Sequence, residues 1–140
     1  MISKNPCSNQ VSHKKIALKE KRSTLVLINE KQVVVDLITV DGCKITSGPR
    51  CDFMVLVANV ATEYFIELKG IDVNHAVTQL TETIKKLSSN ATSTLKVSFI
   101  ICTRSPLSSA EIQGYQIRFK RDFNARLIVK STPFQYKLDN

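Results

Sequence analysis

Two apolar runs dominate the middle of the chain, the first beginning at Phe53 and the second ending at Lys69. Successive residues of a strand point to opposite faces, and these runs are apolar on both faces, as in strands that are covered on each side. About four residues, 58–61, separate the runs, which is the usual length of a hairpin connection. The pattern predicts a buried hairpin, and we expect helices above and below the sheet that contains it.

Hydrophobic spacing predicts two helices. The first begins at about Asp72, a good N-cap residue, and ends at 88–90. Its expected buried stripe consists of Val73, Ala76, Val77, Leu80, Ile84 and Leu87. The second begins near Ser108, which has capping-box spacing to Glu111, and continues to about Phe123.

The remaining segments complete a mixed α/β pattern. Further strands are predicted at 24–29, 32–40, 95–103, 126–129 and 134–138. Residues 1–12 have little periodicity and predict an irregular arm, whereas residues 13–22 fit a short helix. The predicted order is this helical segment, four strands, a helix, a strand, a second helix and the short final strands, which indicates one α/β domain with a helix-covered sheet.

Length and composition limit the class of protein. The chain has 140 residues, which is enough for one domain, 1–140, and too few for two. Hydrophobic residues make up 43% and charged residues 23%, as in an ordinary globular protein. No apolar run approaches the roughly 20 residues of a membrane span, and the first residues lack an apolar signal-peptide region. These features predict a cytoplasmic protein without a membrane partner.

Cysteine spacing and net charge narrow the chemistry. Cys7, Cys43, Cys51 and Cys102 include no C-x-x-C pair, so neither a zinc knuckle nor a redox dithiol is indicated. We expect free thiols, at least two of them small core residues. The formal net charge of +8 favours a polyanionic partner, nucleic acid first, although solubility alone also accounts for a basic surface.

Three charged residues, Asp52, Glu67 and Lys69, lie at one end of the predicted hairpin. Glu67 and Lys69 are two residues apart and share a face, and a hairpin centred near 59–60 places Asp52 opposite Glu67. Like charges at that distance repel, and a divalent cation would hold them together. Two plainer interpretations stay open, in which Glu67 and Lys69 form an ion pair at a strand end and Asp52 caps a turn.

Glu67-Leu68-Lys69 closes a buried strand, an aspartate lies across the hairpin, and a glycine and a helix follow. This arrangement resembles the PD-(D/E)xK nuclease superfamily, whose restriction-endonuclease-like core is a helix, three antiparallel strands, a helix and a further strand. The resemblance covers roughly residues 14–103. It implies a restriction-endonuclease-like mixed β-sheet flanked by helices, with Asp52 and Glu67 binding metal and Lys69 as the catalytic lysine.

The resemblance extends to neighbours of these three residues. It implies that the backbone carbonyl of Leu68 is a further metal ligand, and that Gln79 on the following helix supplies one more polar group. His75 lies one helical turn before Gln79, and Glu20 matches the glutamate that some members place on their first helix.

The implied activity is hydrolysis of DNA phosphodiester bonds by a Mg²⁺-dependent nuclease, with Mn²⁺ as a substitute ion. This chemistry needs hard oxygen ligands for the ion and a positive charge beside the nucleophile, which Asp52, Glu67 and Lys69 would supply. Two residues depart from the family pattern. Cys51 stands where the motif has proline, and Thr83 stands where a helicase-linked variant has tyrosine.

Other functions stay open at this point. The chain would otherwise be a nuclease-fold nucleic-acid-binding or scaffold subunit that does not cleave by itself. A third reading is a small regulatory protein whose basic surface binds an acidic partner. A homodimer would let a nuclease of this size reach both strands of DNA, although no residue locates an interface.

Overall fold

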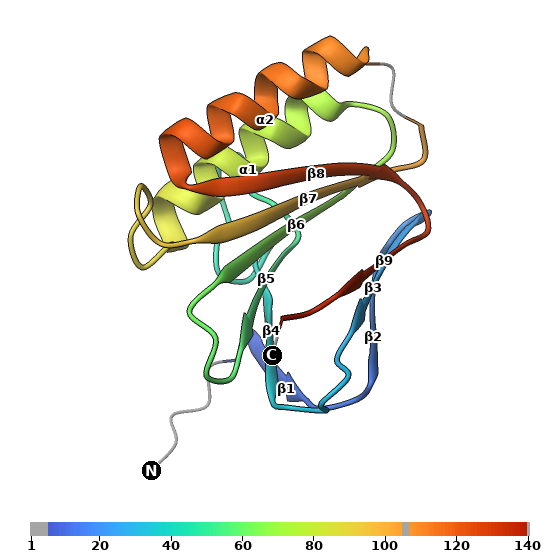
Figure 1. Cartoon of the computed structure of the whole chain (residues 1–140), viewed down its shortest axis with the longest axis vertical. Helices are drawn as coiled ribbons and strands as arrows, with labels where there is room; N and C mark the ends of the chain where they lie inside the picture. Colours follow the sequence, from blue (N-terminus) through green and yellow to red (C-terminus); the bar gives the residue numbers. More distant parts are fainter. Residues whose placement is uncertain (1–5, 105–106, 140) are drawn as a thin grey trace.

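The computed structural model describes residues 6–104 and 107–139. Within these ranges the chain forms two helices and two β-sheets, which confirms the mixed α/β prediction (Figure 1). The order of the six-stranded sheet is β1 (Ser8–Val11), β4 (Val35–Thr39), β5 (Phe53–Val57), β6 (Glu63–Lys69), β7 (Lys96–Cys102) and β8 (Ala125–Ser131). The pairings from β1 to β6 are antiparallel, whereas β6, β7 and β8 are parallel to one another.

The second sheet is small and comes from both ends of the chain. It consists of β2 (Lys15–Glu20), β3 (Ser23–Ile28) and β9 (Phe134–Lys137). Strand β9 pairs in parallel with β3, and Leu25 lies opposite Phe134. A pairing between residues so far apart in sequence carries no local signal, so the spacing of hydrophobic residues predicted strands β3 and β9 but not their pairing.

The two helices begin where the sequence places them. Helix α1 (Val73–Leu87) has Asp72 as its N-cap, whose side chain accepts a hydrogen bond from the backbone N–H of His75. Helix α2 (Ser109–Phe123) begins with the predicted capping box of Ser108 and Glu111. Both caps satisfy backbone N–H groups that have no partner within the helix.

Both helices cover the same face of the large sheet, so the prediction of helices above and below it is wrong. Helix α1 connects β6 to β7 and α2 connects β7 to β8, and these connections step in the same direction across the sheet. Crossovers between parallel strands are right-handed, so two steps in one direction place both helices on one face. The small sheet covers the opposite face (Figure 1).

The large sheet therefore separates two hydrophobic cores. Met54 and Phe65 point toward the helices, whereas Val55 and Ile66 point toward the small sheet. This alternation confirms that β5 and β6 are covered on both faces. It also assigns residues 52, 67 and 69, which continue the rows of Met54 and Phe65, to the helix-facing side.

The N-terminal predictions are wrong in two places. Residues 8–11 of the predicted arm form β1, which pairs with β4, while residues 1–5 lie outside the described residues. The predicted helix at 13–22 is strand β2, in which Ile16 and Leu18 are buried and Ala17 is exposed. Two apolar residues spaced i and i+2 fit a strand, and pairing with β3 along all of β2 decides in its favour.

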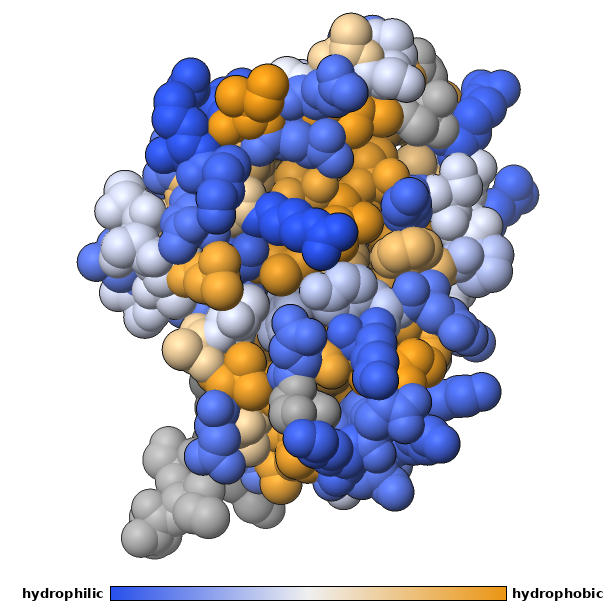
Figure 2. Space-filling model, in the orientation of Figure 1, coloured by the Kyte–Doolittle hydropathy of each residue, from blue (hydrophilic) through white to orange (hydrophobic). Residues whose placement is uncertain are grey.

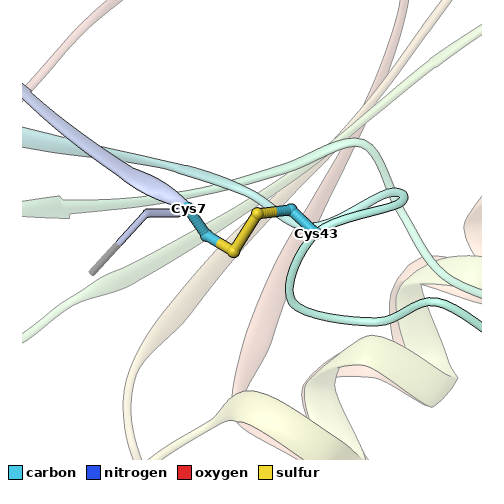
Figure 3. Close-up of a disulfide and its surroundings, with 2 residues drawn as sticks. All are labelled: Cys7 and Cys43. Atoms are coloured by element: carbon cyan, nitrogen blue, oxygen red, sulfur yellow. A yellow bond between two sulfur atoms is a disulfide. The ribbon is translucent and has the colours of Figure 1, made fainter.

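A disulfide corrects the prediction of free thiols. Cys7 and Cys43 are joined, with their Cα atoms 5.7 Å apart, whereas Cys51 and Cys102 are free and buried as expected. Figure 3 shows that the bond ties the start of β1 to the loop after β4. These segments meet because β1 pairs with β4, a contact between distant residues that cysteine spacing does not encode.

Candidate active site

The hairpin of β5 and β6 brings Asp52 and Glu67 together. Phe53 lies opposite Ile66, and the backbone N–H of Asp52 donates to the carbonyl of Ile66 at 3.1 Å. Asp52 and Glu67 come directly after this last pair, and the carboxyl group of Asp52 raises the pKa of Glu67, so the two side chains are neighbours, as the hairpin predicted. Asp52 is 7% exposed and Glu67 is 2% exposed, so both carboxyl groups are buried. Carboxylates are seldom buried unless they bind a proton, a cation or several donors.

Lys69 completes the group. Its Nζ lies 3.3 Å from Oε2 of Glu67, and its side chain is 22% exposed. The two side chains share a face because they are two residues apart on β6. Lys69 therefore lies between a buried carboxylate and the solvent. The ion pair at the end of the strand, which one of the plainer interpretations predicted, is present.

The environment of Asp52 favours its protonated form. Burial raises its pKa to about 6, and the carboxylates of Glu20 and Asp41 add to the rise. The backbone N–H of Leu68 opposes it by donating to Oδ2 of Asp52 at 2.8 Å. This bond fixes one carboxylate oxygen against β6 and excludes a simple turn cap as the whole role of Asp52.

The pKa of Glu67 is raised further than that of Asp52. Burial and the neighbouring Asp52 raise its pKa to about 8, although Lys69 lowers it. Its Oε1 is buried and has no hydrogen-bond partner among the described residues. Leaving a buried acceptor without a donor costs about 1–3 kcal/mol, so this oxygen is placed for a ligand or a proton.

Gln79 and His75 line a hollow of about 330 Å³ beside the segment that leads to Asp52. Nε2 of Gln79 donates to the carbonyl of Arg50 at 2.9 Å, while its Oε1 is buried and unpartnered within the described chain. His75 is exposed. Arg50 pairs with Asp41 at 2.7 Å across the same hollow. The structure thus gathers Gln79 and His75 near the site without placing either against Glu67.

Thr83 positions the backbone beside Asp52. Its Oγ1 accepts from the backbone N–H of Cys51 at 2.8 Å and donates to the carbonyl of Gln79 at 2.8 Å. The residue that departs from the tyrosine of the family pattern is therefore a link from α1 to the start of β5. Burial raises the pKa of Cys51 to about 12, so its thiol stays protonated.

Glu20 approaches the site from the small sheet. It ends β2, and its exposed carboxylate is close enough to Asp52 to raise the pKa of that residue. A second hollow, of about 250 Å³, is bordered by Glu20, Leu68 and Lys69. Oγ of Ser23, which the sequence did not single out, donates to the backbone carbonyl of Lys69 at 2.8 Å. Glu20 thus reaches the site from a strand rather than from a first helix.

The residues present fit a Mg²⁺ ion. Mg²⁺ in proteins uses one or two carboxylates and keeps several waters, which matches Asp52 and Glu67 with the free Oε1. The N–H of Leu68 faces Asp52, and the carbonyl of a strand residue points to the same side as its N–H, so a carbonyl ligand is placed there too. In the described ranges no group of three or more His, Cys, Asp and Glu side chains surrounds one point, so a fully protein-ligated site is not formed.

Comparison with family models, with curated proteins and with solved structures finds no match. Neither helix of the described chain has the length and apolar character needed to cross a membrane. The assignment of a function therefore rests on the geometry and chemistry of the residues themselves.

Proposed function

We propose that this protein is a Mg²⁺-dependent nuclease of the PD-(D/E)xK type, with a restriction-endonuclease-like arrangement around its site, that hydrolyses DNA phosphodiester bonds. The observation that carries the proposal is the buried pair of Asp52 and Glu67 with one unpartnered oxygen, next to the Lys69 ammonium. A merely structural ion pair would satisfy each carboxylate oxygen. Here Oε1 of Glu67 keeps the capacity to bind a metal ion, or a proton shared with Asp52.

Each residue has a defined task in this proposal. Asp52 and Glu67 would hold the ion, together with the carbonyl of Leu68, and the N–H of Leu68 keeps Asp52 oriented. The ion, when bound, polarises the phosphate and lowers the pKa of coordinated water. Nζ of Lys69, held by Glu67 and open to solvent, would donate hydrogen bonds to the attacking oxygen or to the charge that develops on the phosphate.

Two supporting residues have narrower roles. Gln79 has a buried Oε1 that would accept a hydrogen bond from water, because its Nε2 is already committed to the carbonyl of Arg50. The carboxylate of Glu20 would receive outer-shell water at the hollow it borders with Lys69. His75, exposed at the other hollow, is the weakest candidate because none of its side-chain contacts leads to Glu67.

The charge of the chain suits a polyanionic substrate. A net charge of +8 attracts the phosphate backbone irrespective of sequence and makes binding weaken as salt rises. The carboxylate pair alone would repel phosphate, so the surrounding cations are needed to bring DNA to the site. A homodimer, expected for a cut in both strands, stays a prediction.

The test is cleavage of plasmid and branched DNA by purified protein, in Mg²⁺, in Mn²⁺ and in EDTA. We expect cleavage that requires the ion and falls about 100- to 1000-fold in Lys69→Ala, since one charge-stabilising donor is worth that much in comparable sites. Lys31→Ala, which removes an exposed lysine remote from the site, is the matched control.

Three other results would redirect the proposal. Equal cleavage by Lys69→Ala and the parent protein would point to a contaminating nuclease or another site. Binding of DNA without cleavage, across substrates and both ions, would favour a scaffold subunit with the same fold. Absence of binding at moderate salt would favour a regulatory protein with an acidic partner.

A further inference from the structure

We propose that the tight turn between β2 and β3, with Lys21 and Arg22 at its tip, is the element that grips the DNA phosphate backbone next to the active site. This proposal rests on the proposed function, because the DNA contact it describes leads to that site. The turn would bind the DNA without taking part in the cleavage step. The small sheet then has a task beyond covering the hydrophobic core.

The turn is fastened to the catalytic strand. Ser23 is 2% exposed, and its Oγ donates to the backbone carbonyl of Lys69 at 2.8 Å. The next residue, Thr24, donates its N–H to Oγ1 of Thr132, which follows β8. In Figure 1 the tip of the β2–β3 hairpin lies at the end of the large sheet where β6, β7 and β8 end. Anything bound by the turn is thus held at a fixed distance from Lys69.

Lys21 and Arg22 of the turn are exposed to solvent, whereas the carboxylate of Glu20 lies on the side of the active site. Ile16 and Leu18 point inward on β2, so Glu20 continues the inward row, while Lys19 belongs to the outward row. The hollow of about 250 Å³ between this turn and the end of β6 is lined in part by Lys21, Arg22, Lys69 and Thr103. The lining also includes the carboxylate of Glu20, so the cations of the turn and of Lys69 outnumber one negative charge in it.

Lys21 and Arg22 are free to bind an external anion. Both are exposed, and within the described chain neither has an ion-pair partner. By contrast, Arg50 and Arg121 are occupied by Asp41 and Asp122. Figure 2 shows that the side of the molecule formed by the small sheet is mostly hydrophilic. This surface suits a solvated polyanion better than an apolar partner.

Lys21 has a backbone conformation that is unusual for a lysine. Glu20 and Ser23 form the last pair of the hairpin, so Lys21 and Arg22 make a two-residue turn. Lys21 has φ of 52°, in the left-handed region where glycine or asparagine is more easily accommodated. A lysine at such a position is explained if its side chain contributes to binding, and the turn tolerates the less favourable backbone in exchange.

The β8 edge is a less suitable DNA or dimer surface. Antiparallel pairing of two copies around Ile128 would set Arg126 of one copy against Lys130 of the other, and like charges directly opposite destabilise a sheet. Of its neighbours on α2, Lys120 is held by Asn124 and Arg121 by Asp122. Cations without an ion pair in the described chain are present there as well, but none of them is fastened to the catalytic strand as the β2–β3 turn is through Ser23.

The experiment measures binding separately from cleavage. Fluorescence anisotropy of a short labelled DNA duplex, in EDTA and over a range of salt concentrations, is recorded for the parent protein, Lys69→Ala and the double variant Lys21→Gln/Arg22→Gln. Lys15→Gln/Lys31→Gln removes the same charge at the far end of the small sheet and is the matched control. Far-ultraviolet circular dichroism checks that each variant is folded.

We expect the turn variant to bind about tenfold more weakly at moderate salt and to reduce the slope of log Kd against log salt by about 2, because two phosphate contacts are lost. The control should change that slope by much less, and Lys69→Ala should reduce it by about 1 at most, because it removes one of the cations that line the hollow. Lys21→Gly gives a second readout, since it relaxes the turn: we expect a melting temperature at least equal to that of the parent, with weaker binding.

The two failures are distinguishable. Unchanged affinity and slope in both turn variants, with a parent protein that cuts DNA, would overturn the role of the turn and leave the nuclease intact. A parent protein that binds through the turn and never cuts would reject the nuclease and keep the DNA contact. Equal losses in the turn variant and the control would show a diffuse charge effect and would also overturn the proposal.

Discussion

Two buried glutamates on β6, Glu63 and Glu67, lie on the same face of one strand and have opposite surroundings. Glu63 is 5% exposed, and both its oxygens accept hydrogen bonds, from Oγ of Ser88 at 2.5 Å and from the N–H of Ser89 at 2.9 Å. Glu67 is 2% exposed, faces Asp52, and leaves Oε1 without a partner in the described chain. Both oxygens of Glu63 are satisfied within the fold, whereas one oxygen of Glu67 is not satisfied by the described chain.

The lysines at the two ends repeat this contrast. Lys96, opposite Glu63, is buried, and its ammonium donates to the carbonyls of Asn90, Thr94 and Phe123. Lys69, at the other end of β6, contacts Glu67 and keeps part of its side chain in solvent. Burial and charge alone do not mark a functional residue. What distinguishes Glu67 and Lys69 from the other pair is the unsatisfied oxygen of Glu67 and the solvent contact of Lys69.

The largest expected effect is on activity. Glu67→Gln should lower the rate of DNA cleavage in Mg²⁺ about 100- to 1000-fold, because it removes a ligand charge and leaves the fold intact. Glu63→Gln should cut at a rate near that of the parent, per folded molecule. Initial rates at equal concentrations of folded protein measure both. Equal losses in the two variants would erase the contrast between the ends of β6.

The second prediction concerns the lysines. Lys96→Met should lower the free energy of unfolding by about 3–5 kcal/mol, because three buried carbonyls lose their shared donor and Glu63 loses its neighbouring positive charge. Lys69→Met should change the free energy of unfolding little in EDTA. Urea unfolding followed by circular dichroism compares them. A Lys96→Met protein as stable as the parent would show that the buried lysine is not structural.

The third prediction compares the effects of Glu63→Gln and Glu67→Gln on the free energy of unfolding. Glu63→Gln should lower the free energy of unfolding by about 1–3 kcal/mol, since charge-assisted hydrogen bonds at the end of α1 are weakened. Glu67→Gln should raise it in EDTA at about pH 9, above the raised pKa of Glu67, since it removes a buried charge that repels Asp52 and that Lys69 only partly compensates. Thermal unfolding in EDTA gives both signs. A destabilised Glu67→Gln would indicate that the Lys69 ion pair outweighs the burial cost.

The smallest expected effect is on the pH dependence of stability. The pKa is raised to about 6 for Asp52 and to about 8 for Glu67, from ordinary values near 4, so the folded protein binds more protons than the unfolded chain in this interval. The stability present below pH 4 is therefore lost as pH rises from about 4 to about 8. Denaturant unfolding in EDTA at several pH values measures this loss.

Two controls test whether Asp52 and Glu67 cause the pH dependence of stability. Asp52→Asn/Glu67→Gln should remove most of the dependence, because the two groups that carry the shifted pKa values are gone. Saturating Mg²⁺ should stabilise the protein most at high pH, where the carboxylates are ionised and able to bind it. A parent protein that is more stable at pH 8 than at pH 5 in EDTA would contradict the raised pKa values.

The core of the site could be predicted because its geometry is local. A hairpin of fixed loop length pairs Asp52 with Glu67, and residues two apart on a strand place Lys69 beside Glu67. Cap residues likewise gave the starts of both helices, at Asp72 and Ser108.

The missed features depend on contacts between distant residues. The parallel pairing of β3 with β9, and hence the sheet that carries Ser23 over Lys69, has no local signature. The same holds for the bond between Cys7 and Cys43. Strand β2 was mistaken for a helix because Lys15–Glu20 is short and rich in good helix formers, and only its partner β3 decides between the two.

The most direct measurement is anomalous diffraction from crystals soaked in Mn²⁺, on the parent protein and on Glu67→Gln. The account predicts a metal peak in contact with the carboxyl groups of Asp52 and Glu67, lost or greatly weakened in the variant. Mn²⁺ absent from this point at saturating concentration, with Glu67 still paired only to Lys69, would contradict the claim that the buried carboxylate pair is a metal site.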